Sequence, residues 1–241
     1  MAIVKKRSSS KQIIDYILDR IEKRELHSGD QLPNERDFAE MLGVSRVPLR
    51  EAISALSMLG ILEARQGEGT FVNRYDPSIL GKIIYTYTIL DNTSMDEIME
   101  ARKMMEAYAA KLATANATAG DLAEIKDAME KRDKELDRYK AGAGDGESLY
   151  ENDNHFHNAI AKATHNRFCI QFLDAIRRSV WEQQRTGLMQ REMGLFDAAS
   201  DYHHRIFQEI SARNAGEAYR IMFEHIESVQ LSLREQQKKE G

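Results

Sequence analysis

The chain contains a single cysteine, Cys169, among its 241 residues. One thiol cannot form an internal disulfide, so the disulfide-stapled secreted domains are excluded as a class. A free thiol also suits a reducing compartment, and we expect Cys169 to serve in packing. The cysteine content therefore favours a protein of the cytoplasm.

Long apolar runs are also missing from the sequence. The opening stretch, MAIVKKRSSS, has basic residues but no apolar segment after them that is long enough for a signal peptide. No later stretch reaches the roughly 20 apolar residues that a membrane-spanning helix needs. We expect a protein that remains in the cytoplasm and does not enter a membrane.

Proline is scarce, with three in the chain and none after Pro77. Beyond this point nearly every segment has the apolar spacing of a helix, and strand signals are lacking. The sequence predicts a first domain at residues 1–75 and an all-α second domain at residues 76–241. Its seven expected helices span residues 78–90, 94–115, 119–139, 148–165, 168–190, 195–212 and 215–237, with a Gly-rich loop at 141–147.

Excess charge of either sign is small, since the whole chain has a formal net charge of −5. Residues 1–75 contain 12 Lys and Arg against 11 Asp and Glu, whereas the remainder contains 22 against 28. This asymmetry places any nucleic-acid contact in the first domain. Because the asymmetry is modest, such a contact depends on where individual arginines point.

Residues 32–50 have the pattern of two short helices joined by a tight turn. Asn34 can cap the first helix, and Gly43 can take the left-handed backbone conformation that ends it. A preceding helix at residues 10–23 has an isoleucine stripe that would pack behind this pair. The pattern predicts a helix-turn-helix.

The second of the two helices would start at Ser45, with Pro48 in its first turn, where a missing amide hydrogen costs no helical bond. Arg46 and Arg50 lie on a different side of this helix from its apolar stripe. A helix amino end with guanidinium groups suits phosphate or guanine, so we interpret it as a recognition helix. The alternative is an ordinary surface helix with solvated arginines.

The next segments favour the first interpretation. Residues 61–66 and 70–72 read as strands on either side of Gly67-Glu68-Gly69, which forms a glycine turn. Such a hairpin after a helix-turn-helix is a wing, with Arg65 at its base.

Three blocks, at residues 29–36, 43–52 and 67–72, resemble the winged helix-turn-helix signature of the GntR family of bacterial transcription regulators. They occur in the family's order and spacing. The resemblance implies that Arg36, Arg46 and Arg50 contact operator DNA and that Gly67 enters the minor groove. The full set of predicted DNA-binding residues is Arg36, Ser45, Arg46, Val47, Pro48, Arg50, Gln66 and Gly67.

Histidines are concentrated in the second domain, and their spacing indicates which of them could bind one metal ion. Asp153 and His157 are four residues apart, so one helix would present both on one face. If the last two helices turn near Asn214, His203 and His225 lie level with each other across the hairpin. One oxygen and three nitrogens suit zinc, and also nickel, cobalt or manganese.

The alternative for each histidine alone is an ordinary core or surface residue. His155 and His204 point away from the predicted ligand faces and are left out of the site. The joint pattern of Asp153, His157, His203 and His225 predicts a divalent metal site, with zinc as the first choice.

The text around these residues also resembles the FadR-type branch of the GntR family, whose all-α FCD domain binds a divalent metal. The resemblance implies that a small organic or sugar acid occupies the open positions of the metal and that Arg102 points into the pocket to bind this effector. A surface ion pair between Arg102 and Glu106 is the competing interpretation. Periodicity leaves open which of four further residues face the pocket: Arg177, Arg178, Trp181 and Arg185.

The first functional hypothesis is a homodimeric transcription factor, a repressor, that reads a palindromic operator and responds to the acid. A second hypothesis is a metal-dependent hydrolase, but the sequence has no HExxH or similar pairing with a free glutamate. A third is a metal-free relative that senses an acyl thioester, against which the intact Asp/His set argues. The prediction is therefore a non-enzymatic, DNA-binding regulator.

Overall fold

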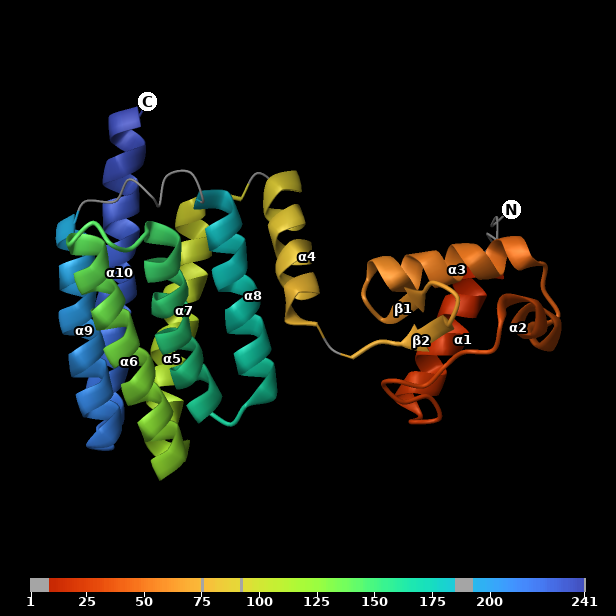
Figure 1. Ribbon diagram of the computed structural model, residues 1–241, viewed down its shortest axis with the longest axis horizontal. Coiled ribbons are helices and arrows are strands. Elements are labelled where there is room, and N and C mark those ends of the chain that lie inside the picture. The colour runs from red at the N-terminus through yellow and green to blue at the C-terminus, as the bar shows by residue number, and fades with distance from the viewer. Residues whose placement is uncertain (1–8, 75, 92, 185–192, 241) are drawn as a thin grey trace, which may run out of the picture. The chain divides into compact units, whose positions relative to one another are not determined.

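A computed structural model describes residues 9–74, 76–91, 93–184 and 193–240. These residues form ten helices and two strands, drawn in Figure 1. The chain divides into two compact units, Met1–Ile79 and Leu80–Gly241. None of the helices in the described part is long and apolar enough to cross a membrane.

The first unit has three helices followed by a hairpin: α1 (Ser9–Glu22), α2 (Glu35–Leu42), α3 (Arg46–Met58), β1 (Leu62–Arg65) and β2 (Gly69–Val72). The strands are antiparallel, with Leu62 opposite Val72 and Arg65 opposite Gly69. Buried residues such as Ile17, Phe38, Leu49 and Leu56 join the three helices in one core. This is the predicted winged helix-turn-helix.

Local interactions explain where α2 begins and ends. The side chain of Asn34 accepts a hydrogen bond from the amide of Asp37, which caps the amino end of α2 as expected. At its other end Gly43 has φ 64°, a left-handed conformation that glycine adopts without a steric penalty. Ser45 occupies the cap position of α3 but makes no side-chain hydrogen bond to that helix, so its predicted capping bond is absent.

The second unit contains only helices among its described residues: α4 (Pro77–Leu90), α5 (Met95–Asn116), α6 (Ala119–Lys140), α7 (Gly146–Ala163), α8 (Arg167–Gln184), α9 (Met193–Ser211) and α10 (Ala215–Glu240). Helix α5 packs against α7, α8, α9 and α10, while α6 packs against α7 and α9 (Figure 1). Met99, Phe156, Ile206 and Ile226 belong to the shared core. The fold class predicted from the sequence is confirmed.

Several helix boundaries differ by a few residues from the predicted ones. Helix α7 begins at Gly146, inside the expected loop 141–147, because the Asp145 side chain accepts a hydrogen bond from the amide of Ser148 and caps the helix there. Helix α8 is described as far as Gln184, and the remainder of the expected helix, residues 185–190, lies outside the described residues. The turn between α9 and α10 falls at Asn214, as predicted.

Candidate functional site

The amino end of α3 carries two arginines at the surface. The Arg46 and Arg50 side chains are 57% and 60% exposed, and both donate hydrogen bonds to Oε2 of Glu35 on α2, at 3.2 and 2.6 Å. The guanidinium of Arg50, followed by that of Arg46, lowers the pKa of Glu35. One carboxylate thus holds two exposed guanidinium groups on the same face.

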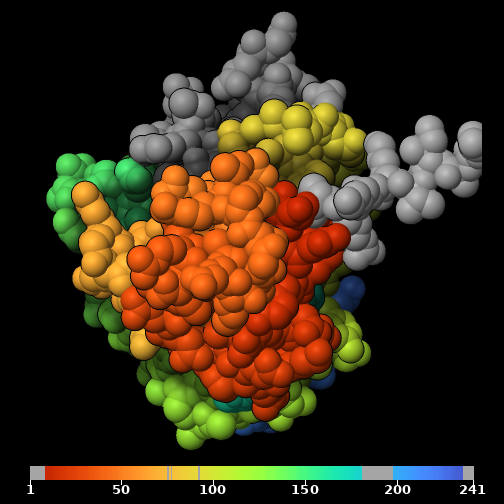
Figure 2. All heavy atoms as spheres, turned by 90° about the vertical axis from the view of Figure 1, so that its right-hand side faces the viewer, coloured from red at the N-terminus to blue at the C-terminus, as the bar shows by residue number. Residues whose placement is uncertain are grey.

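The other predicted DNA-binding residues also lie at the surface of the first unit, whose α1–α3 atoms are red to orange in Figure 2. Arg36 is 81% exposed beside Asp37, and Val47 is 66% exposed. Ser45, Gln66 and Gly67 are exposed, and Pro48 is half-buried. Their contact with DNA remains a prediction.

The wing tip is formed by glycine geometry, since Gly67 has φ 80° and a Cβ there would meet nothing within 4 Å. Behind the tip, Arg65 bonds Glu63 at 2.9 Å and its guanidinium lies 4.5 Å from the centroid of the Phe71 ring. Stacking and ion pairing hold Arg65 in the last strand pair before the tip, opposite Gly69, and not at the base of the wing as predicted. The tip itself is left exposed.

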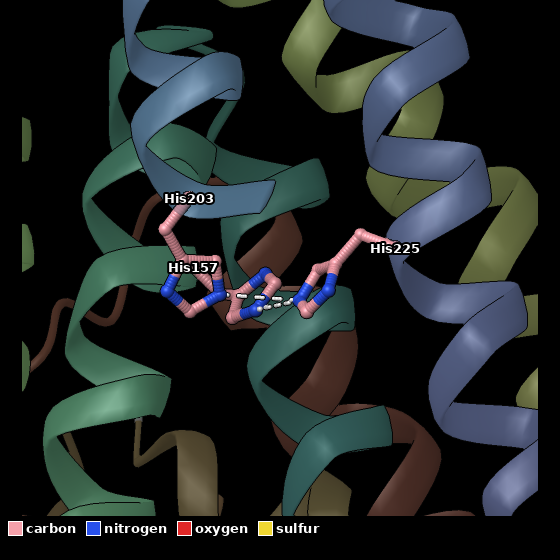
Figure 3. Close-up of side chains that lie close together, drawn as sticks. All are labelled: His157, His203 and His225. Atoms are coloured by element: carbon pink, nitrogen blue, oxygen red, sulfur yellow. Dashed lines mark hydrogen bonds between the residues drawn. The ribbon is translucent and has the colours of Figure 1, made fainter. Parts of the chain in front are cut away.

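In the second unit, three helices bring three imidazoles together in the core (Figure 3). His157 comes from α7, His203 from α9 and His225 from α10, and each is at most 2% exposed. The Nε2 atoms of His203 and His225 are 3.1 Å apart, and those of His225 and His157 are 3.4 Å apart. The level placement expected across the α9–α10 hairpin is present.

Asp153, one turn before His157 on α7, lies beside the same cluster. Its carboxylate oxygens are 3.7 Å from Nε2 of His157 and 3.7 Å from Nε2 of His203. The Asp153 side chain is 24% exposed, unlike the histidines. The four predicted metal ligands are therefore neighbours in space, with Asp153 at the accessible side of the cluster.

The donor set fits a divalent metal. Two nitrogens on a tetrahedral zinc with bonds of about 2.1 Å are roughly 3.4 Å apart, close to the separations of the Nε2 atoms. Burial, with the neighbouring imidazoles, lowers the pKa of His203 well below its usual value and that of His225 to about 3. Both imidazoles are thus neutral at physiological pH, which is the form that binds metal.

Burial alone would raise the pKa of Asp153, but the neighbouring His157 imidazole and the Arg132 guanidinium lower this pKa overall. Arg132, from α6, is fully buried with its Nε 3.4 Å from Asp153. Asp153 is thus held as a carboxylate. Arg132 was not identified from the sequence, since an arginine on a charged helix carries no periodic signal that distinguishes a buried site from a solvated one.

Arg102 forms an ion pair with Glu106, the alternative that their i,i+4 spacing allowed, but the pair is buried and not at the surface. Nε of Arg102 donates to Oε1 of Glu106 at 2.8 Å, and Oε2 of Glu106 contacts Nδ1 of His157. Glu106 was missed as a site residue. Its position four residues after Arg102 was the available signal, and the burial of both side chains was not apparent from spacing.

The structure distinguishes among the four residues for which periodicity could not decide whether they face the pocket. Arg177 is 1% exposed, with Nη1 3.5 Å from Oε1 of Glu106, and it donates a hydrogen bond to Asn158. Arg178 is half-exposed and pairs with Asp174. The side chain of Trp181, and Arg185 as a whole, lie outside the described residues.

The two histidines excluded by their helix angle point elsewhere. His155 is exposed. Nε2 of His204, on α9, is 2.7 Å from a carboxylate oxygen of Asp133 on α6, at the surface of the bundle. A histidine that is rotated by about 100° or more around the helix from a cluster histidine therefore points away from the cluster.

Comparison with known protein families gives two matches along the chain. Residues 9–72 match the profile described as "Bacterial regulatory proteins, gntR family", and residues 97–228 match that of the "FCD domain". The two profiles correspond to the winged helix-turn-helix and to the helical bundle that contains the histidine cluster.

Several relatives align with most of the chain. An Escherichia coli protein assigned to regulation of the L-lactate dehydrogenase operon is 32% identical over 241 residues, covering 96% of this chain and 89% of the relative. The transcriptional regulator LutR of Bacillus subtilis is 30% identical over 216 residues, covering 87% of this chain and 94% of the relative. A solved structure of a Streptococcus agalactiae GntR protein is 26% identical, with a TM-score of 0.68 over 92% of this chain and 99% of that one. The family and these relatives are transcription regulators and not enzymes, which removes the hydrolase hypothesis.

Proposed function

The chain belongs to the GntR family of bacterial transcription regulators and carries an FCD domain, and from this premise we propose that it is a metal-dependent, acid-responsive repressor. In this proposal a small organic or sugar acid binds at a divalent metal in the second unit and releases the protein from its operator. The observation that carries it is the convergence of three buried imidazoles with one partly accessible carboxylate.

Asp153, His157, His203 and His225 are the proposed metal ligands, with zinc as first choice and nickel, cobalt or manganese as alternatives. A bound divalent cation would supply positive charge and open coordination positions that suit a carboxylate. The buried, neutral imidazoles support this assignment because a site that must first lose protons binds metal more weakly. The same cluster argues against a metal-free, acyl-thioester-sensing relative.

The effector is proposed to enter at Asp153, the accessible member of the cluster. Arg132 lies 3.4 Å from this carboxylate, and the charge of Arg102 also lowers its pKa, so both add positive charge to the region, which supports an anionic ligand. We propose Arg102 as an effector-binding residue, since a guanidinium keeps its charge when buried. L-lactate is the first acid to test, because one relative is named for the L-lactate dehydrogenase operon.

Operator DNA is the proposed partner of the first unit, in the cytoplasm. The exposed guanidinium groups of Arg46 and Arg50 at the amino end of α3 support base and phosphate contacts, and the exposed wing tip at Gly67 supports insertion into a groove. A helix-turn-helix protein reads a palindrome as a two-fold dimer, so we propose a homodimer.

Helix α4 supports the homodimer. Tyr87, Ile89 and Leu90 are 68%, 58% and 76% exposed, and Lys82 is the one charged side chain between Pro77 and Leu90. A helix this apolar is normally covered by another surface. A second copy of the same face is a suitable cover because it brings little like charge together despite the net charge of −5.

An acid can change the affinity for DNA only if it binds the DNA-free and DNA-competent conformers unequally. The experiment first selects a binding site from random duplexes and then follows the anisotropy of the selected duplex. L-lactate and a panel of other organic and sugar acids are added to the zinc-loaded protein and to protein stripped with chelator. We expect at least one acid to release DNA from the loaded protein and none to do so after stripping.

Two results would contradict the proposal. If acids released DNA equally well with and without metal, the cluster would not be the effector site. If the wild-type protein bound no divalent metal at all, the third hypothesis, a metal-free sensor, would replace it.

A further inference from the structure

A second set of buried charges lies behind the histidine cluster. Glu106, Arg102 and Arg177 are 2%, 5% and 1% exposed, and they come from α5 and α8, neither of which supplies a proposed metal ligand. Removing three charged groups from water is costly, and an apolar replacement of the same volume is often at least as stable. We therefore expect these three buried charges to have a role other than stabilising the fold.

The two carboxylate oxygens of Glu106 face in different directions. Oε1 accepts a hydrogen bond from Nε of Arg102 at 2.8 Å and lies 3.5 Å from Nη1 of Arg177. Oε2 contacts Nδ1 of His157, the ring nitrogen on the far side from the cluster. Glu106 thus connects two arginines on one side with one imidazole on the other.

The three imidazoles are held in different ways. Among the described residues, Nδ1 of His203 and Nδ1 of His225 have no hydrogen-bond partner, and it is the ion pair with Glu106 that sets Nδ1 of His157 apart from them. The ring of His203 instead stacks on Phe156 with centroids 4.2 Å apart, and His225 lies 5.4 Å from the Tyr202 ring. His157 is therefore the imidazole whose orientation a charged neighbour controls.

We propose that Glu106 is a positioning residue that holds His157 with a proton on Nδ1 and the Nε2 lone pair directed into the cluster, and that Arg102 and Arg177 hold Glu106 in place. A carboxylate at the second ring nitrogen fixes the tautomer of a ligating histidine and increases its basicity. Arg102 then has a contact with the metal site through Glu106 in addition to its proposed effector contact. This inference rests on the proposed metal function.

The first test needs no variant. Full-length protein with 15N-labelled histidine is stripped of metal, and the proton position on each imidazole is read from two- and three-bond nitrogen–proton correlations. We expect His157 to be the Nδ1-protonated tautomer with a downfield-shifted proton. A spectrum in which His157 carries its proton on Nε2 would overturn the inference.

The second test titrates zinc and cobalt(II) into the wild type, Glu106→Gln and Glu135→Gln. Glu135 is a matched control because it is also buried and pairs with an arginine, Arg138, but touches none of the three histidines. We expect Glu106→Gln to bind zinc about 10- to 100-fold more weakly with an altered cobalt(II) absorption spectrum. The zinc affinity of Glu135→Gln should stay within about twofold of the wild-type value, because Glu135 does not contact a ligating histidine.

Circular dichroism of the metal-free variants shows whether each has folded, and if Glu106→Gln has not, the tautomer measurement decides alone. Wild-type protein that binds zinc, together with a folded Glu106→Gln that binds it equally well, would overturn this inference and leave the proposed function standing. A wild type that binds neither metal would overturn both.

Discussion

His157 and His155 are two residues apart on α7, yet one is 1% exposed and the other lies at the surface. The same contrast separates His203, which is fully buried, from His204, which pairs with Asp133 at the surface of the bundle. In each pair of histidines the two side chains are chemically identical and lie close together in the sequence. His155 and His204 therefore serve as internal controls for the candidate metal site.

We predict that His203→Ala and His225→Ala each weaken zinc binding by about 100-fold, since each removes one of four proposed ligands. His155→Ala and His204→Ala should bind zinc as the wild type does. Competition with a chromophoric chelator measures all four affinities. Equal losses in all four variants would point to a change in the fold, and no loss in His225→Ala would contradict the ligand assignment.

The metal-free protein should lose stability as the pH falls from 6.5 to 4.5. An unfolded histidine has a pKa near 6.5, whereas burial lowers that of His225 to about 3, so the unfolded state binds more protons in this range. The expected loss from His225 is roughly 2–3 kcal/mol, and His203 acts in the same direction. Urea unfolding in the presence of chelator at several pH values measures this loss of stability.

The control for this pH dependence is His225→Gln, whose stability should change less over the same range. Glu106 and Asp153 also have lowered pKa values, but the stabilisation that such carboxylates contribute is lost as the pH falls below the unfolded-state values of Glu and Asp, about 4.3 and 3.9. A stability that is constant or increases between pH 6.5 and 4.5 would show that the imidazoles are not buried in their neutral form.

At the scale of single elements, α2, the Gly43 turn and α3 form a unit whose geometry is set locally. The cap at Asn34 and the left-handed turn at Gly43 fix where α2 ends and where α3 starts. Glu35, in the first turn of α2, then binds both arginines at the start of α3. A change in the turn would therefore disturb the placement of Arg46 and Arg50.

Gly43→Ala should destabilise the protein by about 1 kcal/mol, because its φ of 64° is unfavourable for alanine. No atom lies within 4 Å of the added Cβ, so the cost is confined to the backbone. Gly120→Ala, in the first turn of α6, is the matched control and should be neutral or stabilising. Chemical unfolding compares the two, and equal effects would contradict the backbone argument.

Arg46→Ala and Arg50→Ala should each reduce affinity for the selected operator by about 10-fold or more, the effect of losing one bidentate or charged contact. Lys23→Ala removes the same charge from an exposed ion pair with Asp19, just after the end of α1, and should change affinity by less than about twofold. Fluorescence anisotropy at several salt concentrations measures both the affinity and its salt dependence. Operator binding that survives the loss of both arginines would exclude α3 as the recognition helix.

At the scale of the whole molecule, the two units carry separate chemistry. The first unit has the exposed arginines and the wing, and the second has the buried cluster and the apolar helix α4. The proposed regulation requires both, since the acid acts on one unit and the DNA on the other. Dimerisation through α4 is the part of the proposal that operates at this scale.

We predict that Tyr87→Glu converts the dimer into a monomer and weakens operator binding, because it introduces like charges into an apolar contact between two copies. Phe168→Glu alters an equally exposed aromatic on α8 and should leave the dimer intact. Sedimentation velocity at micromolar protein distinguishes the two. A Tyr87→Glu protein that remains dimeric, with unchanged zinc affinity, would place the interface elsewhere.

The sequence by itself determined the features that depend on neighbours along the chain. The Asn34 cap, the Gly43 turn and the helical spacing after Pro77 follow from local backbone chemistry. The i,i+4 spacing of Asp153 and His157 is of the same kind, because one helix turn fixes it.

Only the tertiary structure decided which charged side chains are buried. The Arg102–Glu106 pair has the spacing of a surface ion pair, and the packing of α5 against α7 and α8 places it behind His157. Arg132 and Arg177 are buried for the same reason. Which face of a charged helix turns inward depends on the helices that pack against it, and these lie far away in the sequence.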